Sequence, residues 1–325
     1  MGPNWATMDT VDGKSVLRFE RRIAHPPEKV FTALSDPAEL AHWFPARVET
    51  EPRPGAPMRF VFPGEGTEEG EALTGQVLEF DPPKLFAFEW NGDVLRFELT
   101  PDGTGCLLVF THTVSPDNGG WLAAARNAAG WDTCLAALVA ALDGTGQPAA
   151  GDAASMLASI ESYVERFGLG EGEVHETADG YLLRFERDLV WRPAEQVWSQ
   201  LTAAAEEGAP EPAPGADPPL QATHGYQEEG RLTEVAAPHL LEYEWLHEGA
   251  PAGRVRFEIH TDPQLGTRLV LTQTVPAHLA GSLATVLAAW QTHLELFFAA
   301  LFGEIRCPWP AERTRELETR YAARR

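Results

Sequence analysis

The sequence contains a long internal repeat, and this feature constrains its fold more than any other. Residues 17–23 read LRFERRI and residues 183–189 read LRFERDL, and each segment is followed by a proline and a short helical run. Further pairs occur in the same order along the chain: residues 77–90 with 232–245, 95–100 with 255–260, 107–114 with 269–275, and 130–144 with 289–303. Chance similarity does not keep so many segments in order. The pattern therefore predicts two copies of one fold.

The length of the chain agrees with a duplication, because 325 residues are enough for two domains of ordinary size. Composition shifts suggest where the copies begin and end. The expected divisions are a first domain over residues 1–145, a linker with an amphipathic connecting helix over 146–172, a second domain over 173–305, and a charged C-terminal helix over 306–325.

Each copy shows the same order of predicted elements. An alternating strand over residues 16–24 leads into a helix, and Asp36 before Pro37 is a predicted N-cap of a second, short helix. Strands separated by Gly, Pro and Asp turns follow, and a long helix closes the copy with one apolar stripe at Trp131, Leu135, Leu138 and Leu142. The predicted class is α+β: in each copy, a curved antiparallel sheet of about seven strands wraps around a long C-terminal helix.

Charge and cysteine content narrow the environment and the partners. The chain has 25 Lys and Arg against 48 Asp and Glu, a formal net charge of −23, which disfavours nucleic acid and anionic membranes as partners. No run of 18 apolar residues occurs, and the first residues lack the pattern of a secretory signal. Its cysteines, Cys106, Cys134 and Cys307, form no Cys-x-x-Cys pair. A reducing cytoplasm is therefore expected, without a disulfide framework or a structural zinc.

Several segments of the first copy resemble a known superfamily. The segments are residues 17–45, which end in Trp-Phe-Pro, residues 75–90, and residues 111–114 with 128–138. They are similar to the SRPBCC superfamily of START-like helix-grip domains, and within it to the family named after the activator of the heat-shock-protein-90 ATPase. The resemblance covers residues 12–145, and residues 173–305 match more weakly because the aspartate-led helix and the Trp-Phe-Pro are missing. It implies two tandem helix-grip domains with a hydrophobic cavity between sheet and long helix, and little chemistry.

Aromatic residues are the strongest sign of ligand binding in the first copy. A pocket lined with aromatic side chains and few polar groups is how proteins usually bind small apolar or aromatic ligands, although core packing alone is the alternative. Bulkier residues on the long helix of the second copy predict that the first copy has the larger cavity. The expected lining residues of this kind are Trp43, Phe44, Phe60, Phe62, Phe86, Phe88, Trp90, Phe110, Trp131 and Cys134.

Three polar residues of the first copy are expected to point into the same cavity. Strand alternation places Arg21, Glu79 and His112 on inward faces. The corresponding residues of the second copy are Arg187, Glu234 and Gln273. They are candidate ligand contacts. Alternatively, Arg21 and Glu79 form an ion pair that braces the cavity, with His112 satisfied by a backbone carbonyl. The pair reading predicts that Glu79→Ala costs about 3 kcal/mol. Acid–base catalysis by His112 is disfavoured, because its counterpart in the second copy is Gln273, and a Gln side chain cannot exchange protons at neutral pH.

The sequence supports three functions of different kinds. The first is non-catalytic binding of a small hydrophobic ligand in the first domain. The second, suggested by the family resemblance, is a co-chaperone-like role with a chaperone as partner. The third is suggested by a second resemblance: tandem helix-grip domains of this length are similar to the didomain aromatase/cyclases of aromatic polyketide pathways, a function that would need polar residues deep in a cavity. No Gly-x-Ser-x-Gly elbow, phosphate-binding glycine loop or His-Glu-x-x-His occurs, so no metal and no cofactor is expected.

Overall fold

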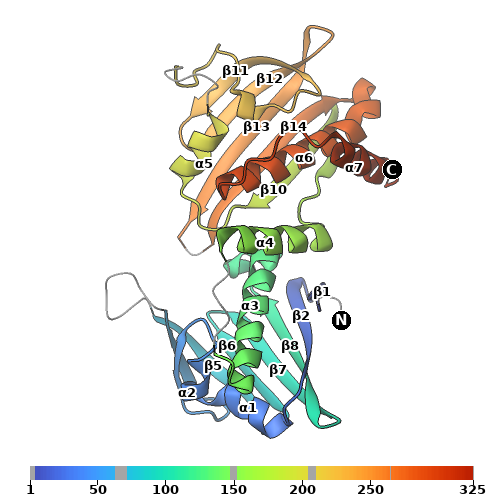
Figure 1. The fold of residues 1–325 in the computed structure, drawn as a ribbon. Coiled ribbons are helices and arrows are strands. Elements are labelled where there is room, and N and C mark those ends of the chain that lie inside the picture. Colours follow the sequence, from blue (N-terminus) through green and yellow to red (C-terminus); the bar gives the residue numbers. More distant parts are fainter. Residues whose placement is uncertain (1–3, 63–71, 147–151, 204–209, 264, 325) are drawn as a thin grey trace. The chain divides into compact units, whose positions relative to one another are not determined.

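The computed structural model describes residues 4–62, 72–146, 152–203, 210–263 and 265–324. The chain divides into two compact units, which are described separately below. The first holds Met1–Asp152 together with Ser159–Tyr163, and the second holds Ala153–Ala158 together with Val164–Arg325. The predicted class is confirmed, because each unit consists of an antiparallel sheet with a long helix after its last strand (Figure 1).

The first unit is built on one antiparallel sheet of eight strands. Their order is β1-β2-β8-β7-β6-β5-β4-β3, so the first two strands join the last one and the others form a meander. The strands are β1 (Thr7–Val11), β2 (Lys14–Ile23), β3 (Arg47–Thr50), β4 (Pro57–Val61), β5 (Ala72–Asp81), β6 (Leu85–Trp90), β7 (Asp93–Asp102) and β8 (Gly105–Val114).

Three helices complete this unit: α1 (Pro27–Ser35), α2 (Pro37–Leu40) and α3 (Ala124–Asp143). The predicted N-cap of α2 is confirmed, since the amide of Ala38 donates to Asp36 Oδ1 at 2.8 Å. Helix α3 lies across one face of the sheet (Figure 1). Its predicted apolar stripe is confirmed, because Trp131, Leu135, Leu138 and Leu142 are all buried.

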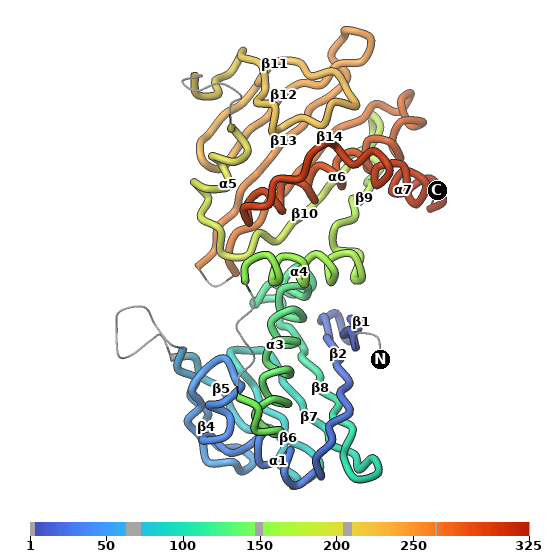
Figure 2. Tube along the Cα trace, in the orientation of Figure 1, coloured from blue at the N-terminus to red at the C-terminus, as the bar shows by residue number. Residues whose placement is uncertain are grey.

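The second unit repeats this plan with a sheet of six strands in the order β11-β12-β13-β14-β10-β9. Its long helix α6 (Leu283–Leu301) crosses the sheet, and α7 (Ala311–Ala322) packs on α6 (Figure 2). The remaining elements are β9 (Glu173–Thr177), β10 (Gly180–Asp188), α5 (Ala194–Leu201), β11 (Glu228–Ala236), β12 (Leu240–His247), β13 (Ala250–Asp262) and β14 (Gly266–Pro276), together with short 3-10 turns.

About seven strands were expected in each sheet. The first sheet has eight and the second has six, because the second lacks counterparts of β3 and β4 among the described residues. The stretch at 210–219, just before β11, is rich in proline. Proline has no amide proton for a strand ladder, so this stretch is a poor sheet former. Strand β11 is consequently an edge of the second sheet.

Helix α4 (Ala153–Phe167) lies within the segment 146–172, for which the sequence predicts a connecting helix. In the described part of the chain, every helix is too short or too polar to cross a membrane.

Candidate functional site

An aromatic cluster fills the space between the sheet of the first unit and α3. The ring of Phe44, which follows α2, is its centre, with ring centroids 5.4 Å from Trp90, 5.8 Å from Trp131 and 6.0 Å from Phe60. Only 7% of Phe44 is exposed. The segment after α2 therefore inserts an aromatic ring between the sheet and α3. This ring occupies the space in which an apolar ligand is expected to bind.

The structure brings most of the predicted aromatic residues together. Seven of them are buried: Trp43, Phe44, Phe60, Phe86, Phe88, Phe110 and Trp131. Phe62 and Trp90 are half-buried and stack on each other, with centroids 5.7 Å apart. Sequence reasoning missed Phe97 on β7, which stacks on Phe110 at 4.4 Å. Its alternation with Leu95 and Leu99 was the available signal.

Cys134 lies one turn after Trp131 on α3 and is half-buried. Burial raises the pKa of its thiol to about 11, so the thiol is protonated at neutral pH and adds apolar volume rather than a nucleophile.

Trp90 differs from its repeat counterpart in how its indole N–H is satisfied. Trp90 Nε1 is buried and has no hydrogen-bond partner among the described residues. Trp245 occupies the corresponding position in the second unit, and its Nε1 donates to the carbonyl of Thr274 at 2.9 Å. Buried donors in proteins are nearly always paired, so the orphan in the first unit requires a specific explanation.

His112 belongs to a buried network that spans β7, β8 and α3. Trp131 Nε1 donates to His112 Nδ1 at 2.9 Å, so the ring proton is on Nε2, which donates to Asp93 Oδ2 at 2.7 Å. The other oxygen, Asp93 Oδ1, accepts from the amide of Ser115 at 2.7 Å and from the Asn118 side chain at 2.8 Å. Both His112 nitrogens are therefore occupied, and the partner of the ring is a carboxylate rather than the expected backbone carbonyl.

The second unit builds the same anchor with a different residue. Trp290 Nε1 donates to Gln273 Oε1 at 2.5 Å, and Gln273 Nε2 donates to Gln227 Oε1 at 2.8 Å. The Gln amide thus provides one acceptor toward the tryptophan and one donor away from it, as the neutral His112 ring does. The shared role of the two residues is to hold the long-helix tryptophan.

Arg21 does not pair with Glu79, and this expectation was wrong. Its guanidinium bonds to Asp132 Oδ1 on α3 at 2.5 Å. Asp132 Oδ2 accepts from the Tyr163 hydroxyl at 2.5 Å, and that hydroxyl accepts from the Ala6 amide at 3.1 Å. The pKa of Asp132 is raised above its usual value, because the effect of burial is larger than the lowering by the Tyr163 hydrogen bond and by Arg21. Arg21 therefore anchors α3 to β2.

Glu79 lies on the outer face of the sheet because β5 contains a bulge. The register shifts between Val77, paired with Phe88, and Glu79, paired with Ala87. The extra residue breaks the alternation, so Val77 points inward and Glu79 points outward, where it forms an ion pair with Arg96. Its second-unit counterpart, Glu234, likewise pairs with Arg256.

The tyrosine anchor also recurs in the second unit. The Tyr321 hydroxyl donates to Gln291 Oε1 at 2.7 Å and accepts from the Gly172 amide at 2.8 Å. Gln291 and Gly172 are the repeat counterparts of Asp132 and Ala6. The recurrence of this tyrosine after each long helix was visible in the sequence and marks a structural role.

The corrected pairing predicts which carboxylate matters for stability. Asp132→Ala should lower the free energy of unfolding of the first unit by about 2 kcal/mol, because it leaves Arg21 and Tyr163 without their partner. Glu79→Ala should cost less than about 0.5 kcal/mol, because its side chain is 52% exposed. Urea denaturation of both variants tests this ranking, and a larger loss for Glu79→Ala would contradict it.

Comparison with solved structures gives matches that cover part of this chain and most of each matched chain. A conserved protein of unknown function from Enterococcus faecalis has a TM-score of 0.41 and 20% identity, covering 50% of this chain and 90% of its own. CalU16 from Micromonospora echinospora has a TM-score of 0.40 and 19% identity, covering 50% and 95%. A protein from Mesorhizobium loti has a TM-score of 0.35 and 29% identity, covering 40% and 98%. Among curated proteins, none matches this chain significantly.

The first unit also matches a family model. The family is described as Activator of Hsp90 ATPase homolog 1-like protein, and its model matches residues 24–143, from the residue after β2 to the end of α3. These residues include Phe44 after α2, Trp90 on β6 and Trp131 on α3. Residues 24–143 are therefore similar to the Activator of Hsp90 ATPase homolog 1-like family, which confirms the resemblance expected for the first copy.

Proposed function

We propose that the first unit binds a small aromatic ligand with one hydrogen-bond acceptor, without transforming it, between the sheet and α3. The ligand ring takes the place of the Phe44 ring, which already lies against Trp90 and Trp131. Phe44 follows the four-residue helix α2 and is not part of the sheet. Its withdrawal would open a space lined by the aromatic cluster, which suits an aromatic guest.

The observation that carries this proposal is the unpartnered indole N–H of Trp90. A buried donor without an acceptor costs about 1–3 kcal/mol, and a ligand acceptor would recover part of that free energy. Trp245, which already donates to Thr274, offers a ligand no such gain. The contrast favours the first unit as the binder and the second as its divergent partner.

The polar groups of the first unit support the aromatase/cyclase alternative less well than they support ligand binding. That chemistry needs free polar side chains in the cavity, and the three candidates are engaged elsewhere. Arg21 is bonded to Asp132, Glu79 lies on the outer face, and His112 uses both ring nitrogens. The chaperone alternative rests on the family description alone.

The proposal predicts a measurable preference for an acceptor-bearing ring. In equilibrium dialysis against the full chain, quinoline and naphthalene serve as matched probes that differ by one ring nitrogen. Trp90→Phe should lower the ratio of quinoline affinity to naphthalene affinity about tenfold, because it removes the N–H that the quinoline nitrogen accepts.

The matched control is Trp245→Phe, which removes an indole N–H that is already paired with Thr274. This variant should leave the affinity ratio unchanged. If neither probe binds the full chain, or if the two variants change the ratio equally, the first unit is not the proposed binder.

A further inference from the structure

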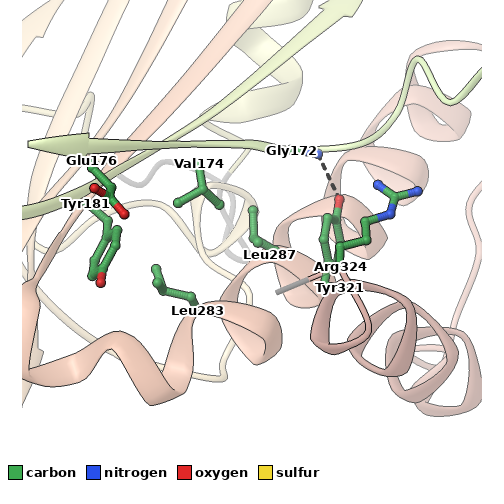
Figure 3. A pocket seen from close by; sticks show the side chains of 8 residues that line it. All are labelled: Gly172, Val174, Glu176, Tyr181, Leu283, Leu287, Tyr321 and Arg324. Atoms are coloured by element: carbon green, nitrogen blue, oxygen red, sulfur yellow. Dashed lines mark hydrogen bonds between the residues drawn. The ribbon is translucent and has the colours of Figure 1, made fainter.

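The second unit contains a pocket of about 370 Å³ that is separate from the aromatic cluster. It lies between the edge strand β9, its neighbour β10, the start of α6 and the end of α7. Val174, Leu283 and Leu287 form its apolar middle, and polar side chains stand at both ends (Figure 3). A pocket with an apolar body and a few polar groups is suited to a small amphipathic molecule.

The two ends of the pocket differ in what they can offer a ligand. At one end, Arg324 forms two hydrogen bonds with Glu171, at 2.5 and 2.7 Å, so its charge is already balanced. At the other end lie Glu176 and Tyr181, which face each other across β9 and β10 (Figure 3). Among the residues that the structure describes, neither side chain has a hydrogen-bond or ion-pair partner. The unbalanced charge of the pocket is therefore the negative charge of Glu176.

We propose that this pocket binds an apolar molecule that carries a single ammonium group. The ammonium lies at the Glu176 carboxylate beside the ring of Tyr181, which can also stabilise a cation. The apolar body lies along Leu283 and Leu287 toward the ring of Tyr321. The strongly acidic chain, with a net charge of −23, attracts such cations. At the far end Arg324 and Glu171 neutralise each other, so that end offers no partner for a second charged group.

The repeat shows that this pocket is specific to the second unit. Its two leucines on α6 are replaced by alanines on α3, and its carboxylate and tyrosine are replaced by short hydroxyl residues. In the same order as Leu283, Leu287, Glu176 and Tyr181, the counterparts are Ala124, Ala128, Thr10 and Ser15. These four positions of the first unit therefore offer smaller apolar side chains and no carboxylate.

The test is calorimetric titration of the full chain with 2-phenylethylamine and with 2-phenylethanol, a neutral probe of similar size. The wild-type protein should bind the amine about tenfold more tightly than the alcohol, as expected for one charged hydrogen bond. Glu176→Gln should abolish this preference. Glu173→Gln is the matched control and should keep the preference. Glu173 is on the same strand but on its opposite face, where its hydrogen-bond partner His175 also lies.

Two further variants keep the proposal falsifiable. Val174→Trp should fill the pocket and abolish binding of both probes, whereas Trp90→Phe in the first unit should leave amine binding unchanged. Equal effects of Glu176→Gln and Glu173→Gln would show non-specific charge attraction and overturn the site. So would amine binding that survives Val174→Trp, or an amine that does not bind at all. Loss of amine binding in Trp90→Phe would place the amine in the aromatic cluster instead.

Discussion

Replacing His112 with leucine should lower the free energy of unfolding of the first unit by about 4 kcal/mol, whereas replacing it with glutamine should cost about 1 kcal/mol or less. Leucine leaves the buried indole N–H of Trp131 without an acceptor and removes one of the hydrogen bonds to the buried Asp93 carboxylate. Glutamine can accept from Trp131 and donate to Asp93, as Gln273 does between Trp290 and Gln227.

Hydrogen exchange of the full chain measures this difference unit by unit. In the leucine variant, slow amides of β8 and α3 should lose about a thousandfold in protection, while amides of β14 and α6 should keep theirs. A glutamine variant as unstable as the leucine variant would contradict the anchoring role. It would show that the imidazole itself is required.

The parts of this fold that could be predicted are those that depend on local periodicity. Leu17 and Phe19 on β2 and Phe110 on β8 are buried, as the alternation of each strand leads one to expect, because side chains two residues apart share a strand face. The duplication correctly predicted two sheets, each with a long helix after its last strand, because both copies carry the same ordered segments.

The parts that could not be predicted depend on irregular backbone or on partners distant in sequence. The bulge after Val77 turns Glu79 outward. No pattern of residues in the sequence predicted that β5 would contain a bulge. Asp93 meets His112 only because β7 and β8 pair in one particular register, with Leu95 opposite His112. Strand alternation therefore predicted that His112 points inward, but it did not predict which residues His112 contacts.

The second unit contains two buried histidines that are expected to make it sensitive to acid. His224 and His293 lie against Trp290, with ring centroids at 4.3 and 5.4 Å. Burial lowers the pKa of His224 to about 3, helped by the charge of His293, and burial lowers the pKa of His293 to about 4. His293 Nε2 has no hydrogen-bond partner among the described residues, so no carboxylate is in place to stabilise a proton there.

Lowering the pH from about 7.5 to about 5 should therefore cost the second unit about 4 kcal/mol of stability, about 2 for each histidine. Both pKa values are lower in the folded protein than in the unfolded chain, where they are about 6.5. The unfolded chain thus binds more protons, and this stability is present above pH 6.5 and lost as the pH falls toward the folded values. Urea denaturation across this range measures the loss. The variant His224→Asn/His293→Cys, which places the first unit's Cys134 at the second position, should lose about 4 kcal/mol less than wild type. An equal loss in both proteins would show that other groups cause the acid sensitivity.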